Sequence, residues 1–171
     1  MSETHSKIFF SETEAKEIPA GFRPIVLTDN FFTPENIGHV IRLAANIGAL
    51  KVIVVGESTL RISKVRKTAG TAFDHIPVEF ISVADITEHI PEEYTLTALE
   101  TVSGAENLFT TKLPDKMALV LGNEKYGVGK ELLNMSSKKI FIPMPGPIKS
   151  MNVSHAAAVC LFHWMGQYTN Q

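Results

Sequence analysis

The sequence has little of several features that would narrow its function at once. Cys160 is the single cysteine among 171 residues, so the chain forms no internal disulfide and no cysteine-based metal site, and a reducing cytoplasm is its expected setting. The six histidines show no metal-ligand spacing, and we expect no metal. No apolar run approaches the ~20 residues of a membrane span, and the first residues lack the apolar core of a signal peptide. We therefore expect a cytoplasmic protein with no membrane partner.

Strong charge is also absent. Acidic residues number 18 and Lys plus Arg 16, which leaves a formal net charge of -2. This balance excludes a strongly basic nucleic-acid binder but not a local basic face. Four basic residues gather in an expected short helix over 61–68: Arg61, Lys64, Arg66 and Lys67. An ordinary solvated helix face and a phosphate-contacting patch both fit this pattern.

What the sequence does contain is an alternation of strand and helix patterns. Strands are expected at 24–28, 51–55, 76–81, 95–99, 117–121 and 140–142, and helices at 35–47, 61–68, 83–90, 130–135 and from 152 onward. Several strands are continuous apolar runs, which predicts an α/β fold with a mainly parallel sheet and helices on both faces. Pro77 places the third strand at an edge.

The expected domain organisation is simple. Residues 23–171 form one domain, preceded by residues 1–22 as an arm or a short helix near 11–17. The segment 103–112 is expected to be irregular or a single helical turn.

Helix 35–47 has the clearest periodicity. Its apolar stripe of Ile37, Val40, Ile41, Ala44 and Ile47 follows helical spacing, so His39 and Arg42 fall on the opposite side. Taken by itself, Arg42 fits an ordinary solvated helix arginine.

The stretch 140–161 joins a short apolar strand, a proline-rich loop and a helix that is apolar on nearly all sides. Three prolines and Gly146 make the loop over 143–151 stiff and non-helical. The following helix is expected to be buried on nearly all sides. The loop suits a ligand site, and it equally suits a connection capped by Asn152 or Ser154 before a core helix.

Ligands of parallel sheets bind outside the carboxyl ends of strands. The candidate site loops are therefore 29–38, 99–104, 122–129 and 143–152. The loop 122–129 is not a Walker A loop, since Val128 follows Gly127 where lysine is required, and no Gly-x-Ser-x-Gly elbow occurs.

Three residue sets remain, in this order along the chain. They are Asn36-Ile37-Gly38 with Arg42; Leu121-Gly122-Asn123-Glu124 with Gly127; and Ile142-Pro143-Met144 with Ser150-Met151-Asn152-Val153-Ser154. Together they resemble the three motifs of the SpoU/TrmH-type family, in the SPOUT class of RNA 2′-O-ribose methyltransferases. The resemblance runs from about Pro24 to Phe162.

The resemblance implies more than the spacing shows. Such proteins have a sheet whose C-terminal part is threaded into a trefoil knot, bind S-adenosylmethionine at the knot, need no metal and work as homodimers. It implies cofactor contacts at Leu99, Gly122, Ile142, Met144, Ser150 and Met151. It implies catalytic roles for Arg42, Asn36, Glu124, Ser150 and Asn152. The substrate would be structured RNA, tRNA by analogy with short relatives and otherwise rRNA, and the basic residues at 61–67 would contact its phosphates.

The chemistry requires an activated 2′-hydroxyl and a proton acceptor. Because the pKa of a free guanidinium exceeds ~12, we expect Arg42 to stabilise developing negative charge and to hold a phosphate. The acceptor is then water, a phosphate oxygen or Glu124. Lys125, Tyr126, His39 and His155 depart from the family pattern.

Two other functions fit the sequence. A non-catalytic RNA-binding protein that retains the fold is one, although the presence of Arg42, Glu124, Ser150 and Asn152 argues against it. A nucleotide-binding α/β enzyme of unrelated chemistry is the other, and the sequence has no phosphate-loop signature for it.

Overall fold

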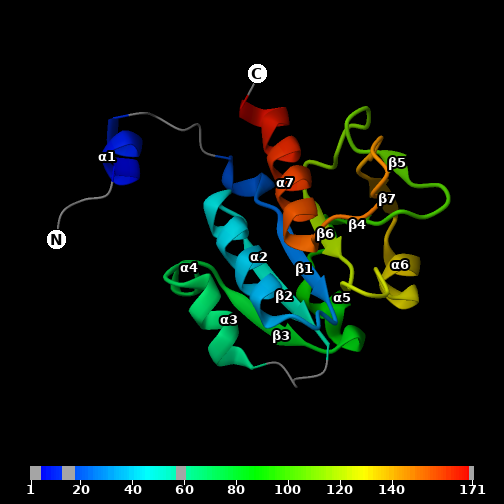
Figure 1. Cartoon of the computed structure of the whole chain (residues 1–171), viewed down its shortest axis with the longest axis horizontal. Coiled ribbons are helices and arrows are strands. Elements are labelled where there is room, and N and C mark those ends of the chain that lie inside the picture. Colours follow the sequence, from blue (N-terminus) through cyan, green and yellow to red (C-terminus); the bar gives the residue numbers. More distant parts are fainter. Residues whose placement is uncertain (1–4, 13–17, 57–60, 170–171) are drawn as a thin grey trace.

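A single parallel sheet organises the chain. The computed structural model describes residues 5–12, 18–56 and 61–169. The seven strands found there are β1 Ile25–Asp29, β2 Lys51–Val55, β3 Val78–Ile81, β4 Thr95–Leu99, β5 Glu106–Asn107, β6 Met117–Leu121 and β7 Lys138–Phe141. They pair in the order β3-β2-β1-β6-β4-β7-β5, and every pairing is parallel (Figure 1).

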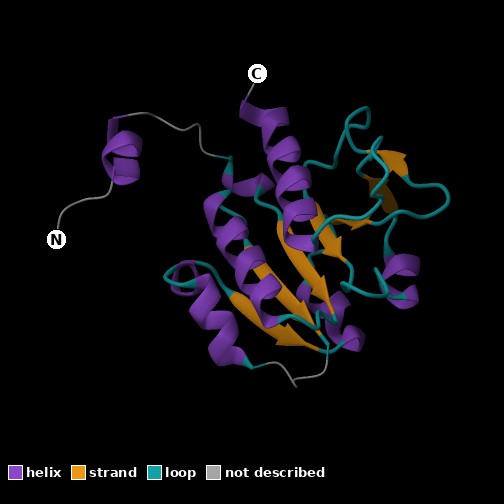
Figure 2. Ribbon diagram, viewed as in Figure 1, coloured by secondary structure: helices purple, strands orange, loops and turns teal. Residues whose placement is uncertain are grey.

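Helices cover both faces of this sheet (Figure 2). One face carries α2 Pro34–Asn46, α3 Ile62–Ala69, α4 Ala72–His75 and α7 Val153–Thr169. The other face carries α5 Ile86–His89 and α6 Lys130–Met135. The remaining helical elements are α1 His5–Glu12 and two 3-10 turns, Ala20–Phe22 and Val83–Asp85. The α/β architecture expected from the sequence is confirmed.

The two-sided core follows from alternation along the strands. In β1, Val26 packs on the side of α2, whereas Ile25 and Leu27 pack on the side of α5 and α6, and all three are fully buried. Because successive side chains of a strand point to opposite faces, a strand covered on both sides must be apolar throughout. All five residues of β6 are buried and apolar, and in β1 the same holds for Ile25, Val26 and Leu27, after which the strand ends in the buried polar residues Thr28 and Asp29.

Two local expectations need correction, and a third is tested only in part. The short helix expected near 11–17 is tested only in part, because a helix spans His5–Glu12 and residues 13–17 lie outside the described residues. Within the segment 103–112, Glu106–Asn107 forms β5, because β7 offers an edge with which these two residues pair. The last long strand starts at Lys138 and not at Ile140. The edge position of β3 is confirmed, and the trefoil threading stays a prediction.

Helix α7 was expected to be buried on nearly all sides, and in the single chain this is wrong. Ala157, Cys160, Leu161 and Trp164 are fully buried on the sheet, and the Trp164 indole N–H donates to the Pro114 carbonyl at 2.8 Å. Phe162, which points the other way, is 47% exposed. Across the described residues, no helix has the length and hydropathy that crossing a membrane requires.

The glycine of the first motif has a packing role. An added Cβ at Gly38 would lie 2.5 Å from the Thr68 Cβ and 2.9 Å from the Val65 carbonyl oxygen. Gly38 thus allows α2 and α3 to approach closely, and α3 carries the basic residues.

We expect Gly38→Ala to destabilise the fold by about 1–3 kcal/mol, because α3 must move outward to admit the methyl group. Urea unfolding midpoints measure the effect. Gly21→Ala is the matched control, since an added Cβ there meets nothing within 4 Å. A Gly38→Ala midpoint equal to that of Gly21→Ala would show that the helices are not held by this contact.

Candidate active site

The four predicted site loops lie side by side. They follow β1, β6, β4 and β7, which are consecutive neighbours in the sheet. Since all of these strands are parallel, their carboxyl ends meet at one edge. Chain order alone does not show this, because β6 inserts between β1 and β4.

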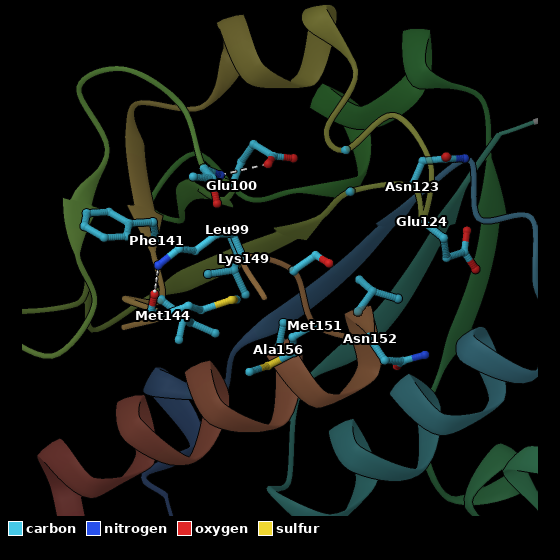
Figure 3. A pocket seen from close by; sticks show the side chains of 16 residues that line it. Leu99, Glu100, Asn123, Glu124, Phe141, Met144, Lys149, Met151, Asn152 and Ala156 are labelled. Atoms are coloured by element: carbon cyan, nitrogen blue, oxygen red, sulfur yellow. Dashed lines mark hydrogen bonds between the residues drawn. The ribbon is translucent and has the colours of Figure 1, made fainter. Parts of the chain in front are cut away.

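A cavity of about 390 Å³ opens between these loops (Figure 3). All six residues that the sequence assigned to the cofactor line this cavity: Leu99, Gly122, Ile142, Met144, Ser150 and Met151. Leu99 and apolar side chains of the stretch after β7 line it, together with polar groups of the loops after β4 and β6, which is the usual make-up of a small-molecule site. The structure thus brings these six residues together at one cavity, whereas their contacts with a cofactor stay a prediction.

Two glycines allow the second loop to fold back on itself. An added Cβ at Gly122 would lie 2.3 Å from both the Gly127 carbonyl carbon and the Val128 nitrogen. Gly127 has φ +70°, a conformation that side-chain-bearing residues rarely adopt. The backbone of Asn123 and Gly127 then closes the turn with two hydrogen bonds of 2.9 Å. Larger residues at 122 or 127 would therefore disrupt this turn.

Carboxylates of the neighbouring loops hold the second loop from both sides. Glu100, after β4, accepts hydrogen bonds from the backbone N–H of Val128 and of Thr101, both at 2.8 Å (Figure 3 shows the latter). Asp29, the last residue of β1, accepts from the Gly129 N–H at 2.6 Å. Both carboxylates fall in loops expected to carry the site, 29–38 and 99–104, but neither was predicted as a site residue. Their position directly at the end of an apolar strand was the signal available for both.

The three motifs meet in one hydrogen-bond network. The Glu124 carboxylate accepts from the Asn36 side-chain amide at 2.8 Å and from the backbone N–H of Phe32 and Thr33 at 2.9 and 3.0 Å. The Asn36 side-chain oxygen in turn accepts from the Asn152 amide at 3.1 Å. Because an ionised carboxylate only accepts, it fixes which end of the Asn36 amide faces Asn152. We call Glu124, Asn36 and Asn152 the amide–carboxylate network.

Asn152 belongs both to the site and to the start of α7. Its side-chain oxygen accepts from the Ser154 N–H at 2.8 Å and from the Ser154 hydroxyl at 2.7 Å, the geometry of a helix N-cap. The two interpretations of this stretch are therefore compatible. Before it, the Lys149 ammonium donates to the Met144 carbonyl at 2.7 Å and holds the ends of the proline-rich loop together (Figure 3).

The electrostatics of Glu124 favour its ionised form. Partial burial raises the pKa of the carboxyl, but the Asn36 amide and the Phe32 and Thr33 N–H groups outweigh burial and lower it below 4.5. Glu124 is therefore a carboxylate at neutral pH with its oxygens engaged by donors.

Arg42 lies apart from this network. It is exposed, as the helical pattern predicted, and lines a separate hollow of about 280 Å³ with His39, Ser154 and His155. The structure thus places two departures from the family pattern, His39 and His155, beside Arg42.

The basic residues of the patch are exposed along α3 and just before it. Two of the four already have partners, since Lys64 lies 3.4 Å from Glu35 and Arg66 lies 3.6 Å from Asp74 and over the Phe73 ring. Exposed pairs of this kind contribute little and exchange readily with a phosphate. In the part of the chain that the structure describes, no three His, Cys, Asp or Glu side chains gather as a metal would need.

Comparison with known proteins agrees with this geometry. The family model of the SpoU rRNA Methylase family matches residues 23–162, and the chain belongs to this family. It is 31% identical over 150 residues to the 23S rRNA (guanosine-2'-O-)-methyltransferase RlmB of Salmonella typhi, covering 86% of this chain and 62% of that protein. The Haemophilus influenzae protein of the same name is 30% identical over 162 residues, covering 92% and 66%. The chain thus spans about three fifths of the length of these relatives.

Solved structures show the same fold. An AdoMet-bound rRNA methyltransferase from Sinorhizobium meliloti superposes with a TM-score of 0.78 at 24% identity, covering 90% of this chain and 59% of that one. A structure on the 2-OH methylation of C/U34 on tRNA superposes with a TM-score of 0.79 at 24% identity, covering 88% and 99%.

The Glu124 network predicts an acid-sensitive contribution to stability. A carboxyl with a lowered folded-state pKa stabilises the fold above its unfolded value of 4.5, and this stabilisation is lost as the pH falls through the folded value. Glu124→Gln should therefore lower the urea midpoint at pH 7, and its difference from the unmodified protein should shrink below pH 4.5.

The control for this comparison is Glu92→Gln, a change at an exposed turn residue. It should follow the unmodified protein at every pH. A Glu124→Gln difference that is constant from pH 7 to pH 3.5 would mean that the charge of Glu124 does not hold the loops.

Proposed function

We propose that the protein transfers the methyl group of S-adenosylmethionine to a ribose 2′-hydroxyl of structured RNA. The observation that carries the proposal is the amide–carboxylate network, which joins all three motifs beside the cavity that contains the six cofactor-site residues. Family membership supports this chemistry, and the curated relatives named above are 23S rRNA (guanosine-2'-O-)-methyltransferases.

The lining of the cavity fits the cofactor. Leu99, Ile142, Met144 and Met151 offer apolar surface for an adenine ring, and the polar groups of the Glu100 and Ser150 loops suit the amino-acid end. When bound, S-adenosylmethionine supplies an electrophilic methyl group on a sulfonium and leaves as S-adenosylhomocysteine. The protein's task is to hold the ribose oxygen in line with that methyl, and positioning of this kind contributes roughly 7–11 kcal/mol at best.

The network suits the ribose side of the reaction. Each amide nitrogen of Asn36 and Asn152 carries two hydrogens, and the network uses one of each. The second hydrogens are donors for ribose oxygens. Because Glu124 fixes Asn36 and the α7 cap fixes Asn152, these donors are preorganised before RNA arrives.

Of the three proton acceptors that the sequence left open, Glu124 is the least suitable. Both of its oxygens already accept hydrogen bonds, from the Asn36 amide and from the Phe32 and Thr33 N–H groups, so Glu124 is poorly placed to take the proton of a 2′-hydroxyl. We infer that Glu124 organises the loops, and that water or an RNA phosphate oxygen receives the 2′-hydroxyl proton.

Arg42 acts on the RNA backbone in this proposal. Its hollow adjoins the start of α7, where Ser154 bonds to Asn152. An RNA strand with its ribose at Asn152 would extend toward Arg42, which then holds the adjacent phosphate and stabilises developing charge. The exposed patch of Arg61, Lys64, Arg66 and Lys67 adds attraction for more distant phosphates.

The functional unit is proposed to be a homodimer. Helix α7 is apolar nearly all round, yet Phe162 is 47% exposed in the single chain. A second copy packed on this face would bury it. Light scattering should then give twice the chain mass of 18.8 kDa, and a methyl-transferring monomer would refute the dimer.

The test of the activity uses methyl-labelled S-adenosylmethionine with tRNA and rRNA fractions from cells that lack the gene. We expect label in one fraction, which identifies the RNA. The modified linkage should resist alkaline cleavage, because the nucleophile for strand scission is blocked. A synthetic RNA with one 2′-deoxy substitution at that nucleotide should bind and accept no methyl.

Methylation of the deoxy substrate would place the methyl group on a base and overturn the ribose assignment. Calorimetry distinguishes the proposed enzyme from the alternative function, a non-catalytic RNA-binding protein. If the folded protein binds RNA but takes up neither S-adenosylmethionine nor S-adenosylhomocysteine, it is a non-catalytic RNA-binding protein.

Arg42→Ala should lower turnover by roughly 100-fold, the effect of losing one charge-stabilising donor. Unfolding midpoint and cofactor affinity should stay near those of the unmodified protein, since Arg42 is exposed and lines a hollow other than the cofactor cavity. Arg23→Ala, an exposed arginine just before β1 at the opposite edge of the sheet, is the matched control. Equal turnover in the two variants would remove Arg42 from the reaction.

A further inference from the structure

Two exposed aromatic rings stand next to the amide–carboxylate network. Phe32 follows β1 and Tyr126 follows β6, which are neighbouring strands. Their ring centroids lie 6.2 Å apart at an interplanar angle of 70°. Phe32 is 60% exposed and Tyr126 is 72% exposed, although rings of this size gain most of their stabilisation from burial.

The backbone beneath both rings is held firmly. The Phe32 N–H donates to the Glu124 carboxylate at 2.9 Å, and the Tyr126 N–H donates to the Asn123 side-chain oxygen at 3.1 Å. The turn that carries Tyr126 is closed by the paired backbone hydrogen bonds between Asn123 and Gly127. The backbone positions from which the rings project are therefore fixed, and Glu124, Asn123 and Gly127, which hold them, also line the cofactor cavity.

A cation accompanies the rings. The Lys125 ammonium lies 4.8 Å from the centroid of the Tyr126 ring, within the range of a cation–π contact. Aromatic rings combined with a basic side chain are the features by which proteins bind single-stranded nucleic acid, since every base has a face that stacks. Protein–protein interfaces, by contrast, are depleted in lysine.

We propose that Phe32, Lys125 and Tyr126 form an aromatic platform that stacks the base of a nucleotide flanking the target ribose. The proposal rests on the function argued above. A ribose drawn to Asn36 and Asn152 takes its nucleotide out of the stack, and the neighbouring base then needs a new partner. The platform supplies the ring surface, and Lys125 supplies a contact for the phosphate. Lys125 and Tyr126 are where this chain departs from its family pattern, so the platform would help to select its RNA.

The experiment measures binding of a fluorescein-labelled single-stranded A12 oligoribonucleotide to the full chain by anisotropy at low salt. Tyr126→Ala and Phe32→Ala should each weaken binding by about tenfold, the effect of losing one stacked base. Tyr126→Trp should bind A12 as the unmodified protein does, because tryptophan keeps a stacking ring at this position. An A12·U12 duplex should lose much less affinity in the alanine variants, because its bases are already stacked.

The control variant is Phe80→Ala, which removes a 40% exposed ring from the edge strand β3. It should bind A12 as the unmodified protein does. Lys125→Gln should reduce the salt dependence of binding by about one released ion. Circular dichroism and the affinity for S-adenosylmethionine should stay unchanged in all five variants.

The platform is wrong if the unmodified protein does not bind A12, or if both alanine variants bind it normally. It is equally wrong if these variants change the mass in light scattering and leave A12 binding intact, since the rings would then contact a second copy. The two proposals fail separately. Ring-dependent A12 binding without methyl transfer to any RNA would refute the enzyme function alone, and methyl transfer with ring-independent binding would refute the platform alone.

Discussion

The pairing of β6 between β1 and β4 is the constraint on which the rest of the site depends. The fully buried run Met117–Leu121 pairs in parallel with a strand on each side. Its loop therefore emerges between the loops of both neighbours. Hydrogen bonds of Asp29 and Glu124 join this loop to the end of β1 and the residues after it. A hydrogen bond of Glu100 joins it to the loop after β4. Both the cavity and the amide–carboxylate network follow from this placement, because neither could form if these strands were separated in the sheet.

Much of the fold could be predicted from the sequence because it depends on local periodicity. The stripe expected over 35–47 became α2 at Pro34–Asn46, and the apolar runs became buried strands. Strand adjacency could not be predicted, since β1 and β6 are roughly 90 residues apart and no local pattern joins them. β5 was missed because two residues carry no alternation and depend on the edge that β7 provides.

The candidate site likewise has residues that the sequence predicted and residues that it did not. Gly122, Ser150 and Asn152 could be identified from motif order, and they meet at the cavity. The separate position of Arg42 follows from helix geometry, because six residues at roughly 100° each turn it about 120° away from Asn36 around α2. Asp29 and Glu100 were missed because a carboxylate after a strand looks like an ordinary loop residue until its backbone partners, 100 and 28 residues away, are known.

The insertion of β6 also has a consequence for how the chain is made. During synthesis, β1 and β2 can pair as soon as both have left the ribosome, but the other edge of β1 has no native partner until residue 121 emerges, roughly 90 residues later. An apolar strand with an open edge is a template for wrong pairing. The nascent protein therefore passes through a stage in which β1, all of whose residues are buried in the finished fold, is paired along one edge alone.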